Sequence, residues 1–266
     1  MENDLIYVYC ILKTAPGQIP DVESLDLKSI LVDDFCAVVK DVSADEFAEE
    51  NLKKNLQDIQ WLEANVRDHI RIIGRIMETG TVIPFKFGTI FNTKPGLETF
   101  LRDYSASLDE NFQLISGKEE WAVKIYYRRK VLVDMIDELS LESAALEKQI
   151  MASSPGKAFL LQRKKEVLVN NEIERICKAY GQLHYDEFNK LSESTSLNNL
   201  LPKELSGREE AMILNAAFLV CKNKVIDFRS TVDKLRNKDG NPGFIIEVTG
   251  PWPPFSFISV KEKENA

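Results

Sequence analysis

The segment LIYVYCIL, residues 5–12, decides the fold class expected of this chain. It is rich in β-branched and aromatic side chains and precedes a Pro-Gly turn, so it predicts a buried β-strand. The segment SILVDDFCAVVKDV, residues 29–42, predicts two further strand pieces that bend at Asp33 and Asp34. The N-terminal part of the chain is therefore expected to be built around a sheet.

A helix is expected to follow these strands. Ser43 and Glu46 have the spacing of a capping box, in which the serine oxygen and the glutamate side chain each satisfy a backbone N–H at the helix start. Apolar residues then recur every three or four positions and form one stripe. The pattern predicts a single helix from residue 43 to Thr79, ended by Gly80.

Two more strands and a second helix follow in the N-terminal part. The segment TVIPFKFGTIF, residues 81–91, predicts a strand at a sheet edge or at a bulge, because Pro84 cannot donate a ladder hydrogen bond. Pro95 lies in the first turn of a second predicted helix, which Gly117 closes. WAVKIYY, residues 121–127, then alternates as a strand does.

These elements predict an α+β fold with two domains. Residues 1–127 are expected to form a ferredoxin-like domain in which two helices cover one side of a small sheet. Helical patterns over 128–151 and 155–191 follow, and the second of these helices would be roughly 55 Å long. Two strands and another helix come after them. Residues 128–266 are therefore expected to form a long helical hairpin followed by a C-terminal α+β domain.

Composition argues against several classes of partner. A formal net charge of −8 argues against nucleic-acid binding, because neutralising phosphates requires a basic face. No stretch approaches the roughly 20 consecutive apolar residues of a membrane helix, and acids stand where a signal peptide has basic residues. We therefore expect a cytoplasmic protein that binds neither nucleic acid nor a membrane.

The sequence also lacks the short motifs of nucleotide, hydrolase and zinc chemistry. The four cysteines are scattered and form no Cys-x-x-Cys pair, which argues against a zinc or redox site. His69 and His184 lie in predicted helices without a metal-binding partner at helical spacing. We predict no catalytic, cofactor-binding or metal-binding residue, and the chain is not expected to be an enzyme.

The segment GPWPPFSFISV, residues 250–260, is unusual for a soluble acidic protein. Its prolines exclude a helix, and the alternation of apolar and polar residues after them predicts a rigid entry into a short strand. Here and in PFKFGTIF, aromatic residues lie beside prolines that blunt sheet pairing. Such segments suit an internal sheet margin and a lip that holds an apolar chain equally well. The candidate partner-binding residues are Pro84, Phe85, Phe87, Trp252, Phe255 and Phe257.

Three of these motifs carry a resemblance to a known family. In this order and at these separations, TVIPFKFGTIF, WAVKIYY and GPWPPFSF resemble the gas vesicle protein F/L family (GvpF/GvpL) of bacteria and archaea. The likeness extends from the YVYCIL strand to the C-terminal motif, and the Gly-Pro-Trp-Pro-Pro-aromatic-Ser-Phe run is its most specific part. Phe255 departs from the tyrosine that is common there in the family.

The resemblance implies two α+β domains of modified ferredoxin-like type and a role in building gas vesicles. Family members are accessory proteins expected to bind the small hydrophobic gas vesicle shell protein (GvpA-type) and to limit its aggregation during nucleation. The apolar shell subunit would lie against the aromatic residues of the two proline-containing segments. The protein would be cytoplasmic and associated with the gas vesicle.

Two alternatives stay open. The chain could be a scaffold that binds other accessory gas vesicle proteins, with the helix over 155–191 as its contact arm. From a different class, it could be a small-ligand sensor or an enzyme on a ferredoxin-like scaffold, since that scaffold hosts many functions.

Overall fold

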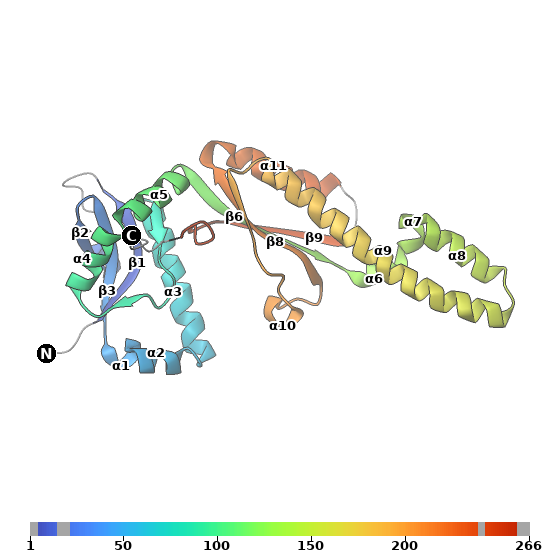
Figure 1. The fold of residues 1–266 in the computed structure, drawn as a ribbon, viewed down its shortest axis with the longest axis horizontal. Coiled ribbons are helices and arrows are strands. Elements are labelled where there is room, and N and C mark those ends of the chain that lie inside the picture. The colour runs from blue at the N-terminus through green and yellow to red at the C-terminus, as the bar shows by residue number, and fades with distance from the viewer. Residues whose placement is uncertain (1–4, 15–21, 239–242, 260–266) are drawn as a thin grey trace, which may run out of the picture. The chain divides into compact units, whose positions relative to one another are not determined.

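The structure, a computed structural model, describes residues 5–14, 22–238 and 243–259 (Figure 1). These residues form helices and two antiparallel sheets. The predicted α+β class is therefore confirmed.

The chain divides into two compact units. Unit 1 comprises residues 1–120 and 251–266, and unit 2 comprises residues 121–250. Each unit contains one of the two sheets and its own hydrophobic core cluster.

These units differ from the domains expected from the sequence, 1–127 and 128–266. Strand β6 (Lys118–Tyr127) was expected in the first domain, but it pairs inside the sheet of unit 2. The C-terminal segment was expected in the second domain. It belongs to unit 1, where Phe255 packs against the core cluster.

The sheet of unit 1 has the strand order β2-β3-β1-β4, and β5 also pairs with β1. The bend expected at Asp33 and Asp34 is the turn of a tight antiparallel hairpin of β2 and β3, with Asp33 in the left-handed conformation at φ 55°. The described elements that precede β6 are β1 (Leu5–Lys13), η1 (Glu23–Leu25), β2 (Lys28–Val32), β3 (Phe35–Val42), α1 (Ala44–Phe47), α2 (Glu49–Asn55), α3 (Ile59–Met77), β4 (Val82–Pro84), β5 (Ile90–Phe91), α4 (Lys94–Asp103) and α5 (Ser105–Ile115).

The single helix predicted from residue 43 to Thr79 is wrong, because the segment forms α1, α2 and α3. Ser43 does cap α1, with its side chain accepting from the backbone N–H of Asp45. A new cap starts α3, where Asp58 accepts from two backbone N–H groups. The carboxylate of Glu46 accepts from the indole of Trp61 rather than completing a capping box.

Helices cover both faces of this sheet, so the prediction that they share one face is wrong. On one face, Ile73 of α3 packs in the core cluster that contains Tyr7 of β1. Successive side chains of a strand point to opposite faces. Cys36 of β3 belongs to the cluster under α3, whereas the ring of Phe35 stacks on Phe112 of α5 at 6.2 Å. The α4–α5 pair therefore covers the other face.

Strand β1 contains a bulge at Tyr9. Its pairing with β3 shifts by one residue between Val8 and Cys10. Because of this shift, Tyr9 and Cys10 both contribute to the core cluster under α3. The strand predicted over 81–91 is interrupted and forms β4 and β5. β4 ends at Pro84 on the edge of the sheet, which is the edge position expected for this proline.

The sheet of unit 2 has the strand order β7-β8-β6-β9. α9 has the extent predicted for the helix over 155–191, whereas the helix predicted over 128–151 is three helices. The described elements after β6 are α6 (Arg129–Asp134), α7 (Ile136–Leu139), α8 (Leu141–Met151), α9 (Pro155–Asn189), β7 (Ser194–Leu197), α10 (Lys203–Ser206), β8 (Ala211–Cys221), η2 (Lys222–Lys224), α11 (Val225–Lys238) and β9 (Phe244–Trp252).

α9 has two roles along its 35 residues. In its first half, the buried ammonium of Lys165 lies 2.8 Å from a carboxylate oxygen of Asp137 and 2.8 Å from one of Glu147, which ties α9 to α7 and α8. In its second half, Phe188 is fully buried in the core of unit 2. Figure 1 shows the same division, with α8 beside one end of α9 and the sheet beside the other.

The prediction of a strand after the C-terminal prolines is wrong within the described residues. β9 ends at Trp252, and the chain then turns, with the N–H of Phe255 donating to the carbonyl of Pro253 at 2.7 Å. We call residues 253–259 the C-terminal turn. Val260, which the predicted strand included, lies outside the described residues.

Candidate functional site

The first group of candidate residues lies where the edge of the unit 1 sheet is interrupted. Pro84 is buried at the end of β4, and Phe85 is half-buried with its ring 5.8 Å from that of Phe100 on α4. The ring of Phe87 lies 6.1 Å from that of Trp61 on α3. Phe85 and Phe87 thus pack against different helices.

The second group lies at the end of β9 and in the C-terminal turn. Phe257 is buried, and Phe255 is half-buried with its ring stacked on His69 at 6.4 Å. Phe87 contacts the same imidazole at 5.8 Å, so the structure brings these two candidates together on His69. Trp252 is the most exposed of the six, at 39%.

Side chains of unit 1 hold the C-terminal turn in place. The N–H and hydroxyl of Ser256 donate to the two carboxylate oxygens of Glu120 at 2.9 and 2.7 Å. Asn111 and Ser259 exchange a further pair of hydrogen bonds at 3.0 and 3.2 Å. Burial raises the pKa of the Glu120 carboxyl, and the bonds from Ser256 oppose that shift. These bonds replace the sheet ladder that the sequence pattern suggested.

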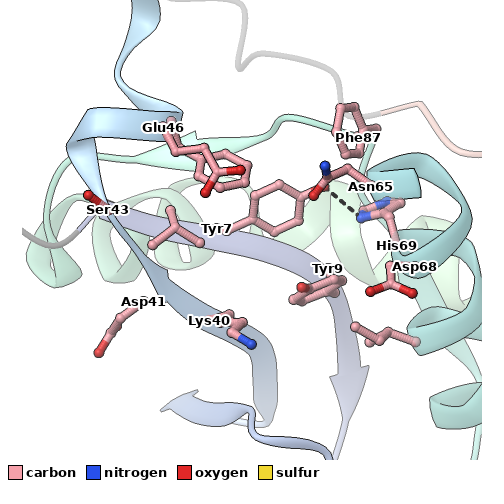
Figure 2. A pocket seen from close by; sticks show the side chains of 13 residues that line it. Tyr7, Tyr9, Lys40, Asp41, Ser43, Glu46, Asn65, Asp68, His69 and Phe87 are labelled. Carbon is pink, nitrogen blue, oxygen red and sulfur yellow. Dashed lines mark hydrogen bonds between the residues drawn. The ribbon is translucent and has the colours of Figure 1, made fainter. Parts of the chain in front are cut away.

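His69 on α3 is hydrogen-bonded through both ring nitrogens, to Tyr7 of β1 and to the backbone of Phe85; the bond to Tyr7 is drawn in Figure 2. One ring nitrogen lies 2.9 Å from the carbonyl oxygen of Phe85, which can only accept, so Nε2 carries the proton. Nδ1 then accepts from the hydroxyl of Tyr7 at 2.9 Å, and that oxygen accepts from the N–H of Gly88 at 3.2 Å. Burial lowers the pKa of His69 and raises that of Tyr7. Both groups are therefore neutral, and their hydrogen bonds hold residues 85–88 against the core.

A cavity of about 330 Å³ lies beside this network. Figure 2 shows its wall built by β1, the end of β3 and helix α3, with the aromatic rings of Tyr7, Tyr9 and Phe87 around it. Its lining residues are Tyr7, Tyr9, Lys40, Asp41, Val42, Ser43, Glu46, Phe47, Asn65, Asp68, His69, Ile72 and Phe87.

Tyr9 places a polar atom against this cavity. Its side chain is 8% exposed, and among the described residues its hydroxyl has no hydrogen-bond partner. Burial, together with the charges of Asp68 and Asp26, raises the pKa of Tyr9 to about 12. The hydroxyl is thus neutral and remains available to a ligand.

Sequence reasoning did not find this cavity. Tyr7 and Tyr9 were interpreted only as part of a buried strand, and His69 was given no ligand. The two-residue spacing of the tyrosines indicated that both side chains share a face. Their meeting with His69 depends on contacts across 62 residues of chain, which no local pattern reports.

The described part of the chain contains no group of three or more His, Cys, Asp or Glu side chains arranged to hold a metal ion. Among the described helices, none is both long enough and apolar enough for a membrane crossing.

Comparison with known families gives one consistent match. Residues 5–259 match the family model described as gas vesicle synthesis protein GvpL/GvpF. Gas vesicle protein L of Streptomyces sp. (strain CB03234) is 25% identical over 264 residues, covering 98% of this chain and 95% of that protein. Gas vesicle protein F of Nostoc sp. (strain PCC 7120) is 24% identical, covering 65% of this chain and 69% of that protein.

Solved structures support the same fold. The crystal structure of GvpF from Anabaena sp. PCC7120 matches with a TM-score of 0.68 and 18% identity, covering 97% of this chain and 99% of that one. GvpF from Microcystis aeruginosa matches with a TM-score of 0.64 and 18% identity, covering 96% of this chain and 99% of that one.

Proposed function

Since the chain belongs to the GvpL/GvpF family of gas vesicle synthesis proteins, we propose that it is an accessory protein that binds the small hydrophobic shell protein of the gas vesicle. In this proposal it limits aggregation of the shell protein while vesicles nucleate in the cytoplasm. The family match supports a gas vesicle accessory role for this chain.

The observation that carries the finer proposal is the exposure of Trp252. Its side chain is 39% exposed, and it directly precedes a C-terminal turn that is fixed by partly buried hydrogen bonds. A tryptophan held on a rigid support gives contact area to an apolar partner at low cost in conformational entropy. The net charge of −8 would keep the complex in solution.

Co-expression with the small hydrophobic shell protein tests this proposal. We expect the shell protein to stay in the soluble fraction and to be retained with this chain in affinity capture. Trp252→Ala should weaken capture without changing the melting curve, because the side chain lies at the surface. Ile226→Ala, which truncates an apolar side chain of unit 2 that is 80% exposed, is the matched control. Insoluble, uncaptured shell protein beside a folded chain would contradict the proposal.

A second candidate function is a scaffold that binds other accessory gas vesicle proteins through the hairpin of α8 and α9. The observation in its favour is a set of exposed apolar side chains near the hairpin end: Met151 at 77%, Phe159 at 63% and Leu160 at 68%. The double variant Phe159→Ser, Leu160→Ser should then abolish capture of those proteins and spare capture of the shell protein.

The finer description of the fold belongs to the same proposal. We propose that both units are modified ferredoxin-like domains. Support comes from the sheet orders, since β6, β7, β8 and β9 in unit 2 and β1 to β4 in unit 1 occupy equivalent places in their sheets. In unit 1, the described residues between β1 and β2 form the short 3-10 helix η1 and no α-helix, where this fold type has its first crossover helix.

A further inference from the structure

We propose that the cavity of unit 1 is a binding site for an organic cation, a guanidinium or ammonium group carried by a small molecule or by a peptide side chain. The inference does not depend on the shell protein being the partner. It rests on the walls of the cavity, on the charges around it and on one tyrosine hydroxyl that has no hydrogen-bond partner among the described residues.

Aromatic rings form one part of the wall. The ring of Tyr7 lies 4.9 Å from that of Tyr9, 5.7 Å from that of Phe47 and 6.1 Å from that of Phe87. These ring pairs are tilted at 51° to 78°, one face of Tyr9 is stacked on His69 at 5.4 Å, and all four aromatic residues line the cavity. A cation within about 6 Å of such faces is attracted by the ring quadrupoles, and more strongly where water is excluded.

Carboxylates form the second part. Asp41, Glu46 and Asp68 line the cavity against a single cation, Lys40, whose ammonium is paired with Asp26 at 2.8 Å. Glu46 accepts the indole N–H of Trp61 through Oε1, and Asp68 accepts from Arg71 through Oδ1. Among the described residues, Oε2 of Glu46 and Oδ2 of Asp68 accept no hydrogen bond, so each remains available to a donor.

The hydroxyl of Tyr9 is the third part. The Tyr9 side chain is 8% exposed, its hydroxyl has no hydrogen-bond partner among the described residues, and in Figure 2 it points into the space beside Tyr7 and Lys40. A ligand N–H would satisfy this oxygen. The negative charges that raise the pKa of Tyr9 would also attract a cation to the same place.

Other ligand classes fit these walls less well. An anion would meet three carboxylates, and an apolar ligand would desolvate them and leave the Tyr9 hydroxyl unpaired. A volume of about 330 Å³ is at the lower end for small-molecule sites. It suits a group of the size of an arginine or lysine side chain rather than a dinucleotide.

NMR titration of the full-length protein tests the proposal. The probes are agmatine, the peptide Gly-Gly-Arg-Gly-Gly and the same peptide with neutral citrulline in place of arginine. We expect the cationic probes to shift the backbone resonances of Tyr7, Tyr9 and His69 and the indole resonance of Trp61. The citrulline peptide should bind at least about tenfold more weakly, because it lacks the charge. Agmatine binding more tightly than the arginine peptide would indicate a small molecule, and the reverse would indicate a peptide side chain.

Two variants that preserve shape complete the test. Tyr9→Phe removes only the unpaired hydroxyl, and Asp68→Asn removes one charge, so each should weaken binding of the cationic probes severalfold. Tyr127→Phe and Asp233→Asn, both in unit 2, are the matched controls and should leave binding unchanged. Equal binding of the citrulline peptide, or no shift of cavity resonances with either cationic probe up to the limit of solubility, would overturn the proposal.

Discussion

The two units build related sheets but fill the faces under their long helices differently. In unit 2, Phe188 of α9 packs with Phe218 and Phe228, and their ring centroids lie 5.1 to 6.0 Å apart. In unit 1, α3 instead brings His69 to Tyr7 beside a cavity. The face of the unit 2 sheet under α9 is therefore filled by packed aromatic rings, whereas the face of the unit 1 sheet under α3 holds polar groups beside a cavity. This difference supports the proposal that the cavity of unit 1 binds a ligand.

The largest expected effect lies in unit 2. Phe218→Ala removes a fully buried ring from the centre of its core, and we expect the free energy of unfolding to fall by about 3–5 kcal/mol. Phe87→Ala in unit 1 removes a half-buried ring beside the cavity and should cost less. Urea unfolding followed by hydrogen exchange of amides in each unit measures both losses. Equal losses would show that the region around Phe87 is packed as tightly as the core of unit 2.

The next largest effect on stability distinguishes Tyr7 from Tyr9, the two tyrosines of β1. Tyr7→Phe leaves Nδ1 of His69 and the N–H of Gly88 without their partner, so unfolding should become easier by about 1–3 kcal/mol. Tyr9→Phe is the matched control, because its hydroxyl bonds to no described residue, and it should leave stability unchanged or raise it. A larger loss for Tyr9→Phe than for Tyr7→Phe would be incompatible with the network around His69.

The pH dependence of His69 is a smaller effect. Burial lowers its folded-state pKa below the ordinary value of about 6.5, so the unfolded chain binds a proton first. The stability that neutral His69 contributes is complete above pH 6.5 and is lost as pH falls from there through the folded-state pKa. Urea unfolding at a series of pH values should show this slope in the native chain and not in His69→Gln. A slope that persists in His69→Gln would assign it to other groups.

Glu120 should give a slope of the opposite sign. Burial raises its folded-state pKa, so the folded protein takes up a proton at higher pH than the unfolded chain does. This contribution to stability is therefore complete below the ordinary carboxyl range and is lost as pH rises through the folded-state pKa. Comparing unfolding of the native chain with that of Glu120→Gln isolates it. If Glu120→Gln keeps the same dependence in that window, the slope comes from other carboxyls.

The sequence predicted the parts of this comparison that depend on local patterns. The β-branched and aromatic composition of residues 5–12 indicated a strand, and helical periodicity indicated the 35-residue helix α9. Periodicity did not reveal the break before Asp58, because the apolar stripe continues across it while a side-chain cap starts a new helix. Likewise, Ser256 bonds to Glu120, 136 residues away, so the alternation after the prolines predicted a strand that did not form.

The candidate site was harder to predict from the sequence, because it depends still more on contacts between residues far apart in the chain. Six aromatic and proline positions were predicted from their motifs, and the structure joins Phe87 and Phe255 through His69. The bulge at Tyr9 shifts the register of β1 against β3 so that Tyr9 and Cys10 both enter the core cluster under α3. A bulge is set by the pairing of two strands, and neither strand sequence reports it alone.

The measurement that tests the account most directly is capture of the small hydrophobic shell protein by three full-length variants in one experiment. Trp252→Ala alters the exposed apolar surface of unit 1, Phe159→Ser alters that of unit 2, and Ile226→Ala is the surface control. We expect Trp252→Ala alone to weaken capture of the shell protein, while all three variants keep the native melting temperature. Loss of capture in Phe159→Ser with full capture in Trp252→Ala would contradict it and would place recognition on the hairpin of unit 2.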